Sequence, residues 1–165
     1  MGSHAGEKNT TGFSNSFFGH FAGHYNETGD GNSFFGQRAG FKSTGNENSF
    51  YGHSAGHNNI LSENTFIGFA AGYSNIYGIG NVFLGYKAGS KETGSYKLYI
   101  DREDTEHPLI WGDFAENNII IYGGFRPIAS YSSSDQRWKK NIQPLESSLD
   151  KVSNLQGVSY EWKID

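Results

Sequence analysis

Large apolar residues recur along the first half of the chain with a period of 16 or 17 residues, always inside the same nine-residue phrase. The phrase is Asn-x-Phe-x-Gly-x-x-Ala-Gly, and it begins at Asn15, Asn32, Asn48, Asn64 and Asn81. A unit this short cannot enclose a hydrophobic core of its own, so it is stable only when it stacks on further copies. The pattern therefore predicts an all-β fold, a parallel β-solenoid of five coils over residues 9–95.

Two large apolar residues stand side by side in the segment that opens each repeat. The first is always Phe (Phe17, Phe34, Phe50, Phe66 and Phe83), and the second varies (Phe18, Phe35, Tyr51, Ile67 and Leu84). These segments are short, aromatic or β-branched, and bounded by glycine, which predicts strands. Successive residues of a strand face opposite sides, so one of each pair lines the interior and the other lies outside. An uncovered apolar row promotes aggregation, and we expect another copy of the chain to cover it.

The rest of each repeat is built from small and turn-forming residues. A segment such as Gly36–Gly40 places alanine between glycines, which suits a narrow corner where backbones approach closely. Polar segments such as Asn26–Gly29 and Glu92–Gly94 predict the outer corners of the coils. The opening asparagine occurs once per coil, which predicts a ladder of amides along the axis with a spacing of about 4.8 Å.

Over about residues 9 to 95 these features resemble the head repeats of trimeric autotransporter adhesins. In that family, coils containing Asn-Ser-x-x-x-Gly stack as a left-handed parallel β-roll in a three-chain bundle. The period is longer here and the side chains are bulkier. The resemblance implies a β-roll within a homotrimer and a role in adhesion.

The pattern changes after the repeats. Three apolar segments separated by turns predict three further strands (Tyr96–Ile100, Pro108–Phe114 and Asn118–Gly124). Because the last coil leaves an unpaired strand edge, we expect residues 96–130 to form a β neck that caps the solenoid. Leu145 to Leu155 has helical spacing and residues 158–164 alternate as a strand, so residues 131–165 predict a short, incomplete α+β module.

Composition narrows the partners further. The net charge is −4, the basic residues are scattered, and no apolar run is long enough to span a bilayer, so we expect neither nucleic-acid binding nor membrane insertion. The 23 glycines and an apolar fraction of 35% favour an elongated fold over a globular one. There is no cysteine to form a disulfide. Residues 1–8 carry no apolar signal segment and are expected to be a leader outside the fold.

A second motif follows the predicted neck. Residues 134–142 match the pattern Ser-Asp-x-Arg-x-Lys-x-x-Ile at every fixed position, which are Ser134, Asp135, Arg137, Lys139 and Ile142. Over about residues 131 to 165 the chain resembles the opening of the intramolecular chaperone domain of endosialidases and other phage tail fibres. The resemblance implies that this module guides trimer assembly and that the chain then cuts itself immediately before the motif serine. It also implies a fibre on a virion tail or on a cell surface.

Carried over to this sequence, the family's dyad gives Ser134 as the nucleophile on the Ser133–Ser134 bond and Lys139 as the base. A serine hydroxyl is a weak nucleophile and requires a base within hydrogen-bond reach. Lysine ordinarily has a pKa of about 10.4, so burial in the assembled trimer, or Arg137 and Lys140 nearby, must lower the pKa of Lys139. At most we expect this one intramolecular cleavage and no turnover enzyme. The family's domain continues through further helices that this sequence lacks, so cleavage of this chain is an open question.

Other candidate sites have simpler explanations. His20 with His24, and His53 with His57, stand four residues apart, but equivalent positions in other repeats hold poor metal ligands. We expect surface or stacking roles for these histidines, and no metal or cofactor. The carboxylates that precede the opening asparagines predict a solvated stripe rather than a catalytic pair (Asp30, Glu47 and Glu63). The acids from Asp101 to Glu106 lack the spacing of a calcium loop and predict an exposed turn.

Three functions stay open at this point. The first is a homotrimeric fibre or adhesin tip with a self-cleaving chaperone, which recognises a glycan or protein receptor. The alternative is a carbohydrate-binding adhesin head without catalytic activity, whose outer aromatics such as Tyr25, Phe41 and Tyr73 stack on sugars. Glycan binding by the solenoid alone distinguishes it. A polysaccharide depolymerase is the least favoured, and release of reducing sugar would reveal it.

Overall fold

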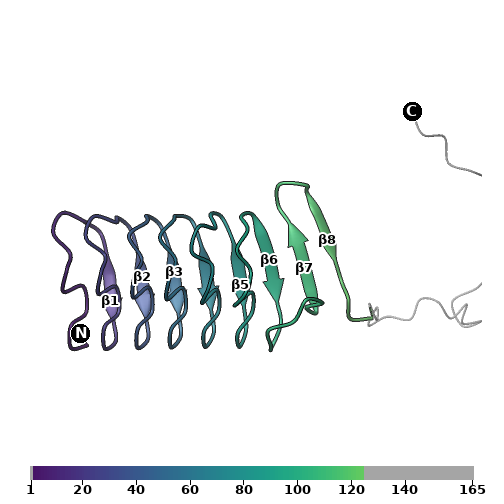
Figure 1. Ribbon diagram of the computed structural model, residues 1–165, viewed down its shortest axis with the longest axis horizontal. Helices are drawn as coiled ribbons and strands as arrows, with labels where there is room; N and C mark the ends of the chain where they lie inside the picture. Colours follow the sequence, from purple (N-terminus) through teal and green to yellow (C-terminus); the bar gives the residue numbers. More distant parts are fainter. Residues whose placement is uncertain (1, 125–165) are drawn as a thin grey trace, which may run out of the picture. The chain divides into compact units, whose positions relative to one another are not determined.

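The computed structural model describes residues 2–124, all within the first of the two units into which the chain divides, Met1–Phe125 and Arg126–Asp165. The described residues form eight strands in one sheet and no helix (Figure 1). The strands are β1 (Ser16–Phe18), β2 (Ser33–Phe35), β3 (Ser49–Tyr51), β4 (Thr65–Ile67), β5 (Val82–Leu84), β6 (Lys97–Ile100), β7 (Ile110–Asp113) and β8 (Asn118–Ile120).

The first five strands are parallel, neighbouring and in register, one from each repeat. Every strand residue pairs with its equivalent one repeat later, as Phe34 does with Phe50 and Phe50 with Phe66. In Figure 1 these strands lie side by side, and each is joined to the next by loops that return the chain to the same end. The predicted all-β class and the parallel β-solenoid of about five turns are confirmed.

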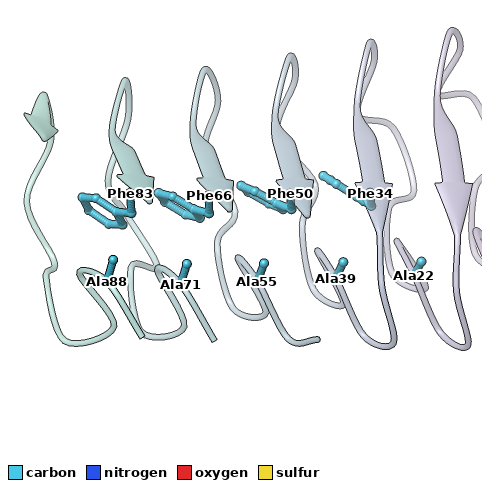
Figure 2. Close-up of a cluster of buried hydrophobic side chains, with 9 residues drawn as sticks. All are labelled: Ala22, Phe34, Ala39, Phe50, Ala55, Phe66, Ala71, Phe83 and Ala88. Carbon is cyan, nitrogen blue, oxygen red and sulfur yellow. The ribbon is translucent and has the colours of Figure 1, made fainter. Parts of the chain in front are cut away.

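The core is a column of phenylalanine rings facing a column of alanine methyl groups (Figure 2). The rings of Phe34, Phe50, Phe66 and Phe83 are fully buried and stack with centroid separations of 4.7–5.0 Å. The alanines of the second layer are equally buried (Ala22, Ala39, Ala55, Ala71 and Ala88). A large ring opposite a methyl group fills the narrow space between the layers, which is the physical reason for the Phe and Ala of the repeat.

Glycine is required where the second layer meets the ring column. Gly56 has a φ of 59°, and a Cβ placed on it would lie 2.4 Å from Cε2 of Phe50. Gly52, which follows the strand, has a φ of 135°, and a Cβ there would lie 2.4 Å from the carbonyl oxygen of Gly68 in the next coil. Both positions therefore exclude any side chain, which explains the two glycines of the repeat.

The predicted asparagine ladder is present. The side-chain oxygen of Asn48 accepts the backbone N–H of Asn64 at 3.0 Å, and that of Asn64 accepts the N–H of Asn81 at 3.0 Å. The side-chain amide of Asn48 donates to the carbonyl of Leu61 at 2.8 Å. The amides are fully buried, so each coil is tied to the next by bonds that water cannot replace.

A second buried ladder, eleven residues after the opening asparagine, lies beside the first, and Asn59 and Asn64 donate to the same carbonyl, that of Gly78. Asn59 donates to the carbonyls of Asn75 and Gly78, and Asn75 donates to the carbonyl of Glu92. The recurrence of Asn at this register was the signal for it in the sequence. Ser43 occupies the same position in the second coil, where its buried hydroxyl has no hydrogen-bond partner.

Residues 2–13 follow the path of the second half of a coil rather than lying apart from the fold as a leader would. The N–H of Gly6 donates to the carbonyl of Ala22 at 2.9 Å, and that of Lys8 donates to the carbonyl of His24 at 3.0 Å. Gly6 has a φ of 62°, as the glycines after the alanines do, and it lies against the ring of Phe17. This segment therefore covers the first ring of the core column.

The three strands expected after Tyr96 are present, and the first of them extends the solenoid sheet. β6 pairs in parallel with β5, and Tyr99 takes the place of the core phenylalanine with its ring edge-on to Phe83 at 5.3 Å. β7 and β8 then add in antiparallel pairs. The Lys97 ammonium forms an ion pair with Asp113, which joins β6 to the end of β7. The change in direction ends the coiled path at β6.

Candidate functional site

The predicted catalytic residues, Ser134 and Lys139, lie outside the described residues, as does the predicted cleavage bond between Ser133 and Ser134. The supporting motif residues lie outside them as well (Asp135, Arg137 and Ile142). The predicted helix and final strand of residues 131–165 lie outside them as well. The predicted dyad and cleavage bond thus stay predictions. The surface that the structure does describe in full is the outer face of the solenoid strands.

This outer face is a continuous apolar row. One residue from each coil belongs to the row, and these residues are 38–60% exposed (Phe18, Phe35, Tyr51, Ile67 and Leu84). The core phenylalanines that precede them in strands β2 to β5 are fully buried. The rings of Phe35 and Tyr51 stack at 4.9 Å with an angle of 2° between their planes. The alternation predicted from the adjacent apolar pair is confirmed. Nothing in the described part of the chain covers the row.

Apolar exposure continues beyond the coils. Ile119 and Ile120 of β8 are 60% and 41% exposed although they face opposite sides of the strand. Both faces of β8 are therefore exposed within the described residues. An open, mainly apolar hollow of about 480 Å³ lies between the ends of β5 and β6 and the turn that follows β6, with Leu84, Tyr86 and Leu109 in its lining.

The histidines stack on aromatic rings. His57 lies between Phe41 and Tyr73 with centroid separations of 5.0 and 4.9 Å, and His53 stacks on Phe69 at 5.1 Å. Burial lowers the pKa of His57, and the neighbouring charges of Lys42 and Arg38 lower it further, although a hydrogen bond to Asn58 opposes them. The stacking role predicted for these histidines is confirmed. Residues 2–124 contain no group of three His, Cys, Asp or Glu side chains placed to hold a metal ion.

The aromatic column beside the histidines offers little platform for a sugar. The Phe41 ring is stacked between His24 at 5.5 Å and His57 at 5.0 Å, so both of its faces are covered. Tyr25 meets Phe41 edge-on at 5.2 Å. A pyranose stacks on an open ring face. Both faces of Phe41 and of His57 are occupied by rings of the neighbouring coils, and one face of Tyr73 is occupied by His57.

The carboxylates that precede the opening asparagines lie in the turns before the strands (Asp30, Glu47 and Glu63). One oxygen of Asp30 accepts the N–H of Phe13 at 2.9 Å, whereas Glu47 and Glu63 are exposed and form no ion pair within the described residues. They belong to different coils along one corner, as a stripe does.

The acidic turn after β6 is stabilised by hydrogen bonds from its backbone N–H groups to the Asp101 carboxylate. Asp101 accepts the N–H groups of Arg102 and Leu109 at 2.6 and 2.9 Å, and Asp104 forms an ion pair with Lys91 at 2.6 Å. Nearby, the Tyr99 hydroxyl donates to Glu92 at 2.8 Å, and burial together with this bond raises the pKa of Tyr99 to about 12. These carboxylates therefore serve the turn, as expected for a charged loop.

With this geometry in place, comparison with known proteins adds one finding. Residues 134–165 match the family described as Chaperone of endosialidase. The match covers about a fifth of the chain and begins at Ser134. No curated protein and no solved structure matches the chain. The described residues contain no helix that could cross a membrane.

The outer face of the solenoid is the main uncovered surface of the described residues. The described surface is a stacked, rigid row of apolar side chains, flanked by loops at both strand ends, and its titratable groups lie in stacks and turns. The chemistry suggested by the motif belongs to the module that matches the chaperone family.

Proposed function

We propose that this chain is the distal part of a homotrimeric fibre, a phage tail fibre or a fibre of a bacterial surface, whose C-terminal chaperone drives trimer assembly. The observation that carries the proposal is the uncovered apolar row along the outer face of the solenoid, joined in one chain to a match to the chaperone-of-endosialidase family. An apolar row exposed to water favours aggregation unless another surface covers it. A chaperone module in the same chain would guide the copies into the assembly that covers it.

A homotrimer is the simplest cover for the row. Three parallel copies that turn their strand faces toward a common axis remove the row from water in every coil at once. Burial of apolar area contributes about 25 cal/mol per Å², so a row repeated in every coil makes assembly favourable along the whole length. The likenesses to adhesin heads and to the chaperone family both support three chains. The receptor is a glycan or a protein on a target cell.

The self-cleavage is proposed as an acyl transfer. The Ser134 hydroxyl attacks the carbonyl carbon of Ser133 while Lys139 takes its proton. The peptide bond between Ser133 and Ser134 breaks, an ester forms on the Ser134 oxygen, and the proton passes to the freed amine. Water then hydrolyses the ester, which releases residues 134–165 with a new N-terminus. The family match begins at the same serine, which supports this position for the cut.

Mass spectrometry of the purified chain tests the cleavage. We expect two products, residues 1–133 and 134–165, from the wild-type chain, and one uncut product from Ser134→Ala or Lys139→Ala. Ser132→Ala is the matched control and is expected to cut normally. Efficient cleavage of either dyad variant would contradict the dyad. An intact wild-type chain would remove self-cleavage from the proposal, and the number of chains per particle would then decide the fibre.

A further inference from the structure

An aromatic column on the outside of the solenoid stops at the fifth coil. We define the histidine column as the residues nine positions after each opening asparagine, which are His24, Phe41, His57, Tyr73 and Ser90. The first four are rings, and they stack with centroid separations of 5.5, 5.0 and 4.9 Å. In the fifth coil a serine takes the place of the ring.

Tyr73 therefore keeps one open ring face. Its other face is stacked on His57, and no ring of residues 2–124 stacks on the face toward Ser90. The N–H of Ser74 donates to the carbonyl of Ser90 at 3.0 Å, so the fourth and fifth coils remain in register here. Because successive coils are about 4.8 Å apart, the place above Ser90 has the height of one stacked ring.

The residues beside the column are also small at this place. In the first coil Phe21 and Tyr25 flank the column, and each meets edge-on the column rings of its own coil and of the next, at 4.6–5.9 Å. The equivalent residues of the fourth coil are Ala70 and Ser74. The large side chains that surround the column at its start are therefore replaced by small ones beside the open face of Tyr73.

The flanking positions of the fifth coil carry positive charge. They are held by Lys87 and Lys91, on the two sides of Ser90. Lys87 forms no ion pair within the described residues, and its ammonium lies 5.3 Å from the centre of the Tyr86 ring. Lys91 pairs with Asp104 at 2.6 Å, but its side chain is 83% exposed. An exposed ion pair contributes little, so an incoming anion can compete for Lys91.

This charge follows a rule that holds along the whole solenoid. Every lysine and arginine of residues 2–96 stands at a flanking position of the histidine column, and no carboxylate does (Lys8, Arg38, Lys42, Lys87 and Lys91). The basic residues are scattered along the sequence, but they are gathered on one side of the coils. Only the fifth coil combines this charge with an open ring face, because both faces of Phe41, which lies between Arg38 and Lys42, are covered.

We propose that the open face of Tyr73 is a binding site for an acidic sugar, a pyranose ring that carries one carboxylate or phosphate group. The apolar face of the sugar ring stacks on Tyr73, in the place where the earlier coils have a further ring. The anionic group is bound by the ammonium groups of Lys87 and Lys91. The inference rests on the proposed function, since it gives a chemical class to the receptor of the fibre.

The site stays accessible in the proposed trimer. The histidine column follows the alanines of the second layer, which face the strands across the core (Figure 2). The outer row lies on the other side of the strands, so association through that row leaves the site open on each chain. Three sites on one particle bind a polymer of acidic sugars more strongly than a single site does.

Three sugars that differ only at carbon 6 test the chemistry. They are methyl glucoside, methyl glucuronide and methyl glucoside 6-phosphate, titrated against the full chain with ligand-observed NMR. We expect a Kd of about 1–10 mM for at least one acidic sugar and binding at least about fivefold weaker for the neutral one. Tyr73→Ala should weaken binding at least about tenfold, and Lys87→Ala should remove most of the preference for the acidic sugar.

Ser90→Phe tests the open face itself. It places a ring on Tyr73 while Tyr73, Lys87 and Lys91 all remain, so it is expected to abolish binding without lowering the Tm. Ser90→Ala should bind as wild type does. Two further controls should leave binding unchanged: Tyr77→Ala, which removes an exposed tyrosine outside the column, and Lys42→Ala, which removes a lysine beside a ring whose faces are covered.

The outcomes keep the site and the fibre apart. Equal affinity for the neutral and acidic sugars, no binding of either acidic sugar at about 50 mM, or normal binding by Ser90→Phe overturns the site. Should Ser90→Phe not fold, normal binding by Tyr73→Ala overturns it instead. Binding of one acidic sugar alone supports the site and identifies its anionic group. A trimer in sedimentation that binds no acidic sugar leaves the fibre proposal standing, and a monomer that binds one overturns the fibre proposal but not the site.

Discussion

The inner and outer columns of the solenoid are made of neighbouring residues with different constraints. Phe50 and Tyr51 are adjacent in β3, and both stack on rings of the neighbouring coils, yet Phe50 is fully buried and Tyr51 is 42% exposed. The inner ring is confined by Ala55 and Gly56, and all five coils use Phe there. The outer position is unconfined within the chain and varies among Phe, Tyr, Ile and Leu. The inner column therefore specifies the fold, and the outer column is the surface through which we propose that the chains associate.

The largest effect is expected from truncating the inner column. Phe50→Ala leaves a ring-sized cavity between stacked neighbours and should lower the free energy of unfolding by about 3–5 kcal/mol, measured from the urea unfolding midpoint. Tyr51→Ala is the matched control in the next residue. It should change the stability of the isolated chain by less than about 1 kcal/mol and should instead weaken association. Equal losses in the two variants would contradict the division between the columns.

The next largest loss of stability is expected where the Ala-Gly layer approaches the core phenylalanine rings. Gly56→Ala introduces a Cβ 2.4 Å from the Phe50 ring at a φ of 59° and should cost about 2–4 kcal/mol of unfolding free energy. Gly124→Ala is the control, because a Cβ at Gly124 meets nothing within 4 Å. Thermal unfolding of both variants measures the difference. An unchanged Gly56→Ala would show that the layers are not packed as closely as described.

A smaller, stabilising effect is expected at the gap in the second ladder. Ser43→Asn places an amide where Asn26 and Asn59 make buried hydrogen bonds and Ser43 makes none, so unfolding free energy should rise by about 1 kcal/mol. Ser43→Ala, which removes the unpaired hydroxyl without adding an amide, should gain less. A loss of stability in Ser43→Asn would mean that the corner has no room for the longer side chain.

The smallest effect concerns pH. The folded chain holds the pKa of His57 below its ordinary value of 6.5, mainly through burial, so the folded state binds fewer protons than the unfolded state. Its contribution to stability is therefore fully present above pH 6.5 and is lost as the pH falls below that value. His57→Gln should flatten the fall in the unfolding midpoint between neutral and mildly acid pH, relative to wild type. A steeper fall in the variant would contradict the sign.

The sheet could be predicted from the repeat because a constant period places equivalent residues of successive coils next to one another, and the glycines mark where each strand ends. The Phe and Ala positions, the asparagine ladder and the outward apolar row all follow from one alternation of residues. The half coil at residues 2–13 was missed because only the Ala-Gly end of the phrase is present there, at Ala5 and Gly6. The strand at Tyr96–Ile100 was predicted, but its place as a sixth parallel strand of the stack was not, because Tyr99 replaces the phenylalanine and Lys97 the asparagine.

Some features of the candidate site could likewise be predicted from the sequence and others could not. The outer row was predictable from two adjacent apolar residues in one short strand. The stacking partners of His53 and His57 could not be derived as firmly, since they depend on which side chains the corners bring into line in neighbouring coils. The Ser134 and Lys139 dyad stays a prediction from the motif.

The mass of the particle in sedimentation equilibrium tests the central claim most directly, that copies of the chain cover the outer row. The account predicts a particle of three chains, each of 18.2 kDa or shortened at Ser134. A stable monomer that shows no association up to high micromolar concentration would contradict it.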